Sequence, residues 1–127
     1  MLNKITLMGR NTRDPELRYT TQNVPVTTFT LAVDRDYQPG GNKQTDFITC
    51  IAWRRTAEFV NEYFHKGDMV AVSGSLQTRE YTDRDGNKRK VFEVVADNVY
   101  FCERKKNDAP APSTTFEDLD DDEPLPN

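Results

Sequence analysis

The chain has 127 residues, a mass of 14.6 kDa and a formal net charge of −4. This length suits one domain, and no run approaches the roughly 18 apolar residues that a membrane span requires. The N-terminus lacks the apolar stretch of a secretory signal, so we expect a cytoplasmic protein. Cys50, Cys102 and the single His65 lie in no metal-like spacing, so we expect no metal, no other cofactor and no disulfide, with both cysteines buried or half-buried.

The acidic residues are unevenly distributed. Seven of the 21 acids lie within residues 107–127, which contain no Lys or Arg, and this leaves 14 acids against 17 bases in residues 1–106. The body of the chain is therefore mildly basic and compatible with a polyanionic partner.

Two segments of the first half alternate apolar and polar side chains. The alternation in residues 3–9 and 26–33 predicts two strands, and residues 45–53 predict a third. The stretch from Pro39 to Asn42 contains two glycines and predicts a loop between the second and the third.

The third predicted strand is apolar on both faces. Ile48, Cys50 and Ala52 are compact and suit a core, whereas the opposite face carries the large rings of Phe47 and Trp53. At the usual rise per residue these two rings lie about 20 Å apart.

One helix is predicted between Thr56, which can cap its start, and Gly67, which stands where a C-cap belongs. Apolar residues recur four positions apart between them, as Phe59 and Tyr63 do. His65 is expected at the end of this helix, in solvent or near the negative end of the helix dipole.

The chain then returns to strand structure. Residues 69–77 predict a strand, residues 78–82 lead into a turn at Asp85 and Gly86, and a long strand follows over about 90–101. Five main strands with one helix between the third and fourth predict an all-β fold, the five-stranded OB-fold barrel, with a protruding hairpin. A general α+β sheet with one helix is the alternative.

Beyond residue 106 the composition changes. Residues 109–115 are rich in Ala, Pro, Ser and Thr and predict a short linker. We therefore divide the chain into a domain of residues 1–106 and a disordered linker and acidic tail of residues 107–127. The tail mixes acidic with apolar side chains and is a candidate partner-binding segment, comprising Asp120, Asp121, Asp122, Glu123, Pro124, Leu125 and Pro126.

Catalysis has little support in the sequence. There is one His, no phosphate-binding glycine loop and no nucleophile motif. We do not expect an enzyme.

Aromatic residues beside basic ones point to nucleic acid, because a single strand is bound by rings that stack on bases and by cations that contact phosphates. The candidate stacking residues are Tyr37, Phe47, Trp53 and Tyr81, with Arg55, Arg79, Arg84 and Lys88 among the nearby cations. The alternatives are that Phe47 and Trp53 form a second core layer under the helix and that Tyr81 packs across strands.

The order of several stretches over about residues 1–104 resembles the bacterial single-stranded DNA-binding protein family (SSB). None of these stretches is specific alone, but the ordered set is. They are Leu2 to Arg10, Arg13 to Tyr19, Thr28 to Val33, Asp46-Phe47, Ile51 to Arg55, Lys66-Gly67, Val72 to Arg79, Tyr81 to Asp83 and Asp85-Gly86.

This resemblance implies an OB-fold, a homotetramer around which single-stranded DNA wraps, no catalysis, and a role in replication, recombination and repair at the nucleoid. It assigns stacking to the same four rings, three of which the family often fills with Trp. It assigns phosphate contacts to Lys4, Arg10, Arg55, Lys66 and Arg79. An OB module that binds RNA or only proteins is the second hypothesis.

The tail departs from the family pattern. Family members usually carry a longer linker and end in Pro-Phe after an acidic run, whereas this acidic run is followed by Pro124-Leu125-Pro126-Asn127. The resemblance implies that the tail recruits replication and repair proteins. The departure from the family's Pro-Phe pattern affects this recruitment and not the binding of DNA.

Deleting residues 107–127 is expected to leave the affinity for single-stranded DNA equal or higher, because seven acidic residues leave the vicinity of a basic surface. Titration of the full and shortened chains with oligo(dT) measures this. A sharp loss of affinity in the shortened chain would make the tail part of the binding body.

Overall fold

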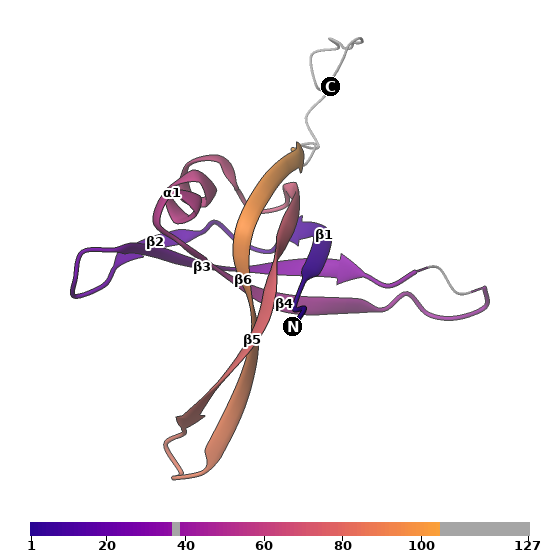
Figure 1. Ribbon diagram of the computed structural model, residues 1–127. Coiled ribbons are helices and arrows are strands. Elements are labelled where there is room, and N and C mark those ends of the chain that lie inside the picture. The colour runs from indigo at the N-terminus through magenta and orange to yellow at the C-terminus, as the bar shows by residue number, and fades with distance from the viewer. Residues whose placement is uncertain (37–38, 105–127) are drawn as a thin grey trace.

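The computed structural model describes residues 1–36 and 39–104. The predicted tail of residues 107–127 and the predicted stacking residue Tyr37 lie outside them. The elements follow in the order β1 (Ile5–Asn11), β2 (Glu16–Tyr19), β3 (Pro25–Asp34), β4 (Thr45–Trp53), α1 (Arg54–Tyr63), β5 (Met69–Thr82) and β6 (Lys88–Glu103) (Figure 1). Every predicted strand is present, and β2 is an additional short one.

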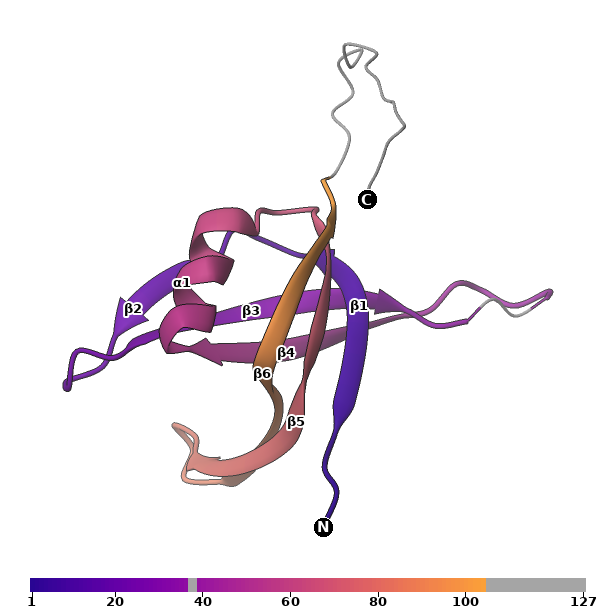
Figure 2. The ribbon, with the colours of Figure 1, turned by 45° about the horizontal axis from the view of Figure 1, so that its top comes forward.

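Five of the strands close into a ring. β1 pairs antiparallel with β5 from Ile5 to Arg10, and its end pairs with β3, where Arg10 lies opposite Ala32. β3 pairs with β4, β5 with β6, and a short parallel pairing of β4 with β6 completes the ring, while β2 flanks β3. α1 lies against β3, β4 and β6 (Figure 2). The predicted OB-fold barrel is confirmed, with α1 between the third and fourth strands of the ring.

The core lies between the inner faces of the ring and one face of α1. The alternation in the sequence assigned the inward side chains correctly, since Phe29 and Leu31 of β3 and Val70 and Val72 of β5 are all buried. The ring of Phe29 meets that of Phe64 edge-on, with 6.1 Å between centroids. The remaining members are Cys50, Ala52, Ala57, Val60, Val94 and Ala96.

The two cysteines have different environments. Cys50 is fully buried in β4, and this burial raises the pKa of its thiol to about 12. Cys102 is exposed near the end of β6, so the expectation that both are buried or half-buried is wrong for Cys102.

The predicted helix boundaries are both wrong. The N-cap is Trp53, with no side-chain capping bond, and Thr56 lies inside α1. Arg54 has a φ of 57°, a left-handed conformation that is rare for residues other than Gly. This conformation lets β4 turn directly into α1 without a loop, so no capping side chain precedes the helix.

The end of α1 also differs from expectation. The C-cap is Phe64, and the backbone N–H of Gly67 donates instead to the carbonyl oxygen of Asn11 in β1, at 2.7 Å. His65 therefore follows the helix. Its ring nitrogen lies 3.8 Å from the carboxylate of Asp68, which is buried.

β5 and β6 form one long hairpin that leaves the barrel (Figure 1). Residues 78–82 continue β5 without a break, and Thr82 still pairs with Lys88. The turn predicted at Asp85 and Gly86 is confirmed, with Gly86 at a φ of 82°. The outer half of the hairpin is exposed on both strands.

A bulge at Gly74 marks the part of the hairpin that belongs to the barrel. The register of β5 against β6 shifts between Ser73 and Gly74. A Cβ atom at Gly74 would overlap the carbonyl oxygen of Val95. Only glycine allows the two backbones to approach this closely.

Gly74→Ala is expected to lower the free energy of unfolding by about 1–3 kcal/mol, because the added methyl group forces the two strands apart. Urea unfolding followed by circular dichroism measures the change. The control is Ser73→Ala, which removes atoms at the neighbouring position. Equal stability of the two variants would show that the close approach is not required.

Candidate nucleic-acid interface

Three of the four predicted stacking residues lie in the described part of the chain, and all three are exposed. The exposed fraction is 68% for Phe47, 40% for Trp53 and 46% for Tyr81. The alternative that Phe47 and Trp53 form a second core layer is therefore wrong. Tyr37 lies outside the described residues, so its position stays a prediction.

Trp53 stands where β4 turns into α1. Its ring borders a depression of about 370 Å³ that the turn between β2 and β3 also lines, through Thr20, Thr21, Gln22 and Val24. Arg54 lies on the same depression. The ring is thus flanked by one cation, three polar side chains and one valine, which suits a base that stacks and a phosphate that follows it.

Phe47 lies in a shallow groove of about 570 Å³ between β1, β3 and β4. Met8 and Met69 supply further apolar lining, and Arg10 and Lys43 supply positive charge. Both cations are engaged within the fold. Arg10 donates to the carbonyl oxygen of Gly67 at 2.9 Å and lies 3.6 Å from the carboxylate of Glu103, and Lys43 pairs with Asp34 at 3.0 Å.

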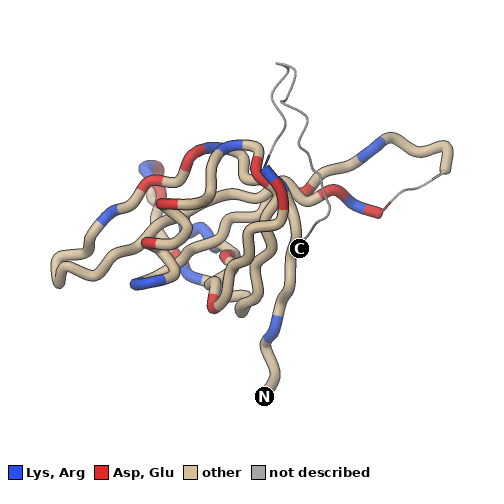
Figure 3. Tube along the Cα trace, turned by 90° about the horizontal axis from the view of Figure 1, so that it is seen from above, with Lys and Arg blue, Asp and Glu red and all other residues tan. Residues whose placement is uncertain are grey.

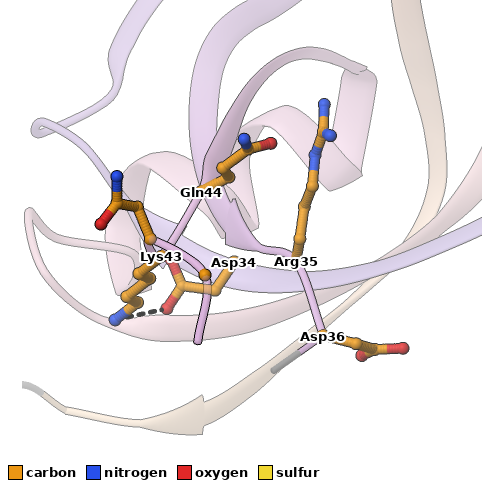
Figure 4. Close-up of a pocket in the computed structure, with 7 residues that line it drawn as sticks. Asp34, Arg35, Asp36, Lys43 and Gln44 are labelled. Carbon is orange, nitrogen blue, oxygen red and sulfur yellow. Dashed lines mark ion pairs between the residues drawn. The ribbon is translucent and has the colours of Figure 1, made fainter. Parts of the chain in front are cut away.

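The base of the loop between β3 and β4 contains a pocket of about 410 Å³ (Figure 4). Asp34 and Lys43 point toward one another there, while Arg35 points away from them. Arg35 donates from Nε and Nη2 to both carboxylate oxygens of Asp46, at 3.0 and 3.1 Å. These bonds lower the pKa of Asp46 and raise that of Arg35, so the arginine nearest to Tyr37 in the sequence is already neutralised.

Tyr81 lies between two ion pairs on one face of the hairpin. Arg79 donates from Nε to Glu93 at 2.9 Å on one side of it. On the other side Arg89, directly opposite Tyr81, donates from Nε to Asp83 at 2.9 Å. Each guanidinium is held beside the ring by a carboxylate that is itself largely covered.

The predicted phosphate contacts are dispersed. Among the described residues, Arg10 and Arg79 form ion pairs, whereas no carboxylate pairs with the other predicted cations, which are Lys4, Arg55, Lys66, Arg84 and Lys88. Lys4 precedes β1, Arg55 is in the first turn of α1, Lys66 follows α1, and Arg84 and Lys88 are at the hairpin tip. Figure 3 shows Lys and Arg interleaved with Asp and Glu along the chain rather than gathered in one stripe.

Other kinds of site are not supported in the described ranges. Residues 1–36 and 39–104 contain no cluster of three or more His, Cys, Asp or Glu that suits a metal ion. The same ranges contain no helix long and apolar enough to cross a membrane.

Sequence reasoning missed the neighbours of Trp53 in the turn between β2 and β3. They lie about 30 positions earlier in the chain, and only the pairing of Val26 with Trp53 brings them close. The ion pairs that engage Arg10 and Arg79 were also missed. Arg89, Val91 and Glu93 recur two positions apart on one face of β6, and that period was the available signal for the pair of Arg79 with Glu93.

A closed ring of five strands with one helix between the third and fourth defines an OB-fold protein, a class whose barrels bind oligonucleotides and oligosaccharides. The model of the single-strand binding protein family matches residues 2–102. The chain belongs to that family, and the resemblance found in the sequence is confirmed.

Curated relatives agree with this assignment. The chain is 54% identical over 106 residues to the single-stranded DNA-binding protein of Caldanaerobacter subterraneus subsp. tengcongensis, covering 83% of this chain and 71% of that protein. It is 48% identical over 110 residues to single-stranded DNA-binding protein 3 of Listeria innocua, covering 86% and 69%. It is 48% identical over 106 residues to single-stranded DNA-binding protein A of Bacillus subtilis, covering 83% and 62%.

The hairpin tip is expected to loosen in acid. The Asp83 carboxylate accepts hydrogen bonds from the backbone N–H groups of Asn87 and Asp85 and from Arg89, and these bonds lower its pKa below the usual 3.8. A lowered folded-state pKa means that the stabilisation is complete above the usual pKa and is lost as the pH falls through the lowered value.

Amide shifts of Asp85 and Asn87, followed by NMR from pH 6 downward, are the measurement. An Asp83→Asn variant keeps an acceptor oxygen but cannot titrate, so its amides are expected to show no such transition. The same transition in this variant would assign it to another group.

Proposed function

We propose that this chain binds single-stranded DNA without sequence preference and thereby protects and organises it in replication, recombination and repair. The observation that supports this most is the exposure of Phe47, Trp53 and Tyr81 on the strands of an OB-fold barrel whose named relatives are single-stranded DNA-binding proteins. An exposed ring stacks on any base, because every base has a π-face. The protein acts by binding, with no catalytic step.

Stacking and charge contribute differently to this binding. Base–aromatic stacking contributes about 1–3 kcal/mol per base, so the rings together supply several kcal/mol per subunit. The cations without ion pairs add a salt-dependent contribution, with a slope of about −0.7 in log K against log salt for each phosphate neutralised on a single strand. Arg54 directly follows Trp53 and Arg55 comes next, and neither forms an ion pair with a described residue.

The functional assembly that we propose is a homotetramer, located in the cytoplasm at the nucleoid, around which the strand wraps. The basis is the family, together with the apolar side chains left exposed outside the barrel core, such as Leu76, Tyr100 and Phe101. Light scattering of the full chain measures the assembly directly.

The division into a binding domain of residues 1–106 and a tail of residues 107–127 belongs to the same proposal. The tail contributes acidic and apolar side chains for replication and repair proteins, while the barrel binds DNA. The family match ends at residue 102, which supports a boundary close to the end of β6.

Poly(dT) is expected to quench the fluorescence of Trp53, the only tryptophan in the chain, because a stacked base contacts its ring. A Trp53→Ala variant is expected to bind at least about fivefold more weakly, and Trp53→Phe to lose less. Absence of both quenching and a mobility shift at low salt would contradict the function. A preference for structured RNA in matched competition would favour the RNA-binding alternative.

A further inference from the structure

The hairpin of β5 and β6 has a second face, opposite to the one that carries Tyr81. Residues directly across an antiparallel pair share a face, and so do residues two apart on one strand. Three cross-strand pairs therefore form this face in its outer half: Thr78 with Phe92, Glu80 with Lys90, and Thr82 with Lys88. We call these six residues the Phe92 face.

Phe92 is among the most exposed large apolar side chains of the barrel and hairpin. Its exposed fraction is 60%, comparable with that of Phe47, and no ring contact within the described residues involves it. Two residues before it on the same strand and face is Lys90, and two before that is Lys88. Two cations thus precede the exposed ring on its own face, at successive spacings of about 7 Å.

The cations on the two faces of the hairpin differ in whether a carboxylate already binds them. On the face of Tyr81, both arginines are bound by carboxylates at 2.9 Å. On the Phe92 face, Lys88 and Lys90 form no ion pair with any described residue, although Glu80 lies opposite Lys90. This face therefore keeps two free ammonium groups against one carboxylate, and a phosphate reaching it displaces no existing partner.

We propose that the Phe92 face is a second contact for a nucleic-acid single strand, in which Phe92 stacks on a base and Lys90 and Lys88 contact the adjoining phosphates. The inference rests on the proposed function and extends it, because the single strand then contacts both faces of the hairpin. A ring with free cations beside it is the combination that non-specific single-strand binding uses.

A second copy of the chain fits this face less well. Contact between two copies across a twofold axis brings the same patch of each together. Each patch carries two free lysines and one glutamate, so the contact would place an excess of positive charge around two apolar rings. A polyanion complements that charge.

The decisive experiment places the only tryptophan at position 92. In a Trp53→Phe background, Phe92→Trp is expected to show quenched fluorescence on saturation with oligo(dT). The matched control is Tyr100→Trp in the same background. Tyr100 lies on the same strand, about 26 Å further along it, among the side chains assigned above to contact between subunits. Its tryptophan is expected to stay unquenched in a variant whose assembly, measured by light scattering, equals that of the unsubstituted chain.

Phe92→Ala, checked for its fold by circular dichroism, is expected to weaken oligo(dT) binding at least about fivefold. Lys90→Gln is expected to reduce the slope of log K against log salt by about 0.7. An unquenched tryptophan at position 92 in a variant that still binds oligo(dT) overturns the inference and leaves the proposed function intact.

Two further outcomes also count against the proposal. A change in molecular mass of Phe92→Ala with unchanged affinity would assign the face to contact between copies. No binding of oligo(dT) by the unmodified chain would remove the proposed function and this inference together.

Discussion

β1 forms hydrogen bonds to two strands at once, to β5 along most of its length and to β3 at its end. This double pairing closes the barrel, and closure decides where every other side chain can go. The interior is filled mainly by Phe29, Leu31, Val70 and Val94 with the apolar face of α1. Large rings on the outer faces of the same strands have no core to enter and remain exposed.

Closure also explains why several arginines near the rings already have carboxylate partners. Cross-strand neighbours in a closed barrel are set by register, and the register places Asp46 within reach of Arg35 and Glu93 within reach of Arg79. Tyr81 is therefore flanked by ion pairs. Cations without an ion pair remain beside Trp53, on Arg54 and Arg55, and on the hairpin.

Much of this fold was predictable because strands with one buried face carry their assignment in the alternation of side chains. Apolar and polar side chains alternate along β3, compact apolar side chains recur on one face of β4, and Gly86 marks the turn between β5 and β6. β2 was not predictable, since four residues with no buried side chain give no period. The predicted start of α1 was wrong because the chain turns at Arg54 through a left-handed backbone conformation, which the residue types around it do not indicate.

The candidate rings were predictable, but the state of their arginines was not. Tyr81 and Trp53 stand beside arginines in the sequence, and exposure of both rings follows from the strand period. Whether Arg35 or Arg79 is free depends on a carboxylate 11 or 14 residues away on the neighbouring strand. Which carboxylate lies within reach is known only when the register of the two strands is known. Phe92 was overlooked for a related reason, because its cationic neighbours appear only when Lys88 and Lys90 are placed on its face.

The contrast between the two thiols offers a practical use. Cys50 is enclosed by the barrel and hardly ionises near neutral pH, whereas Cys102 is open to solvent at the end of β6. Since thiolates are the species that react with maleimides, a dye can be attached at one defined point without mutagenesis. That point is close to the junction between barrel and tail. The chain can therefore carry an optical reporter there without any amino-acid substitution.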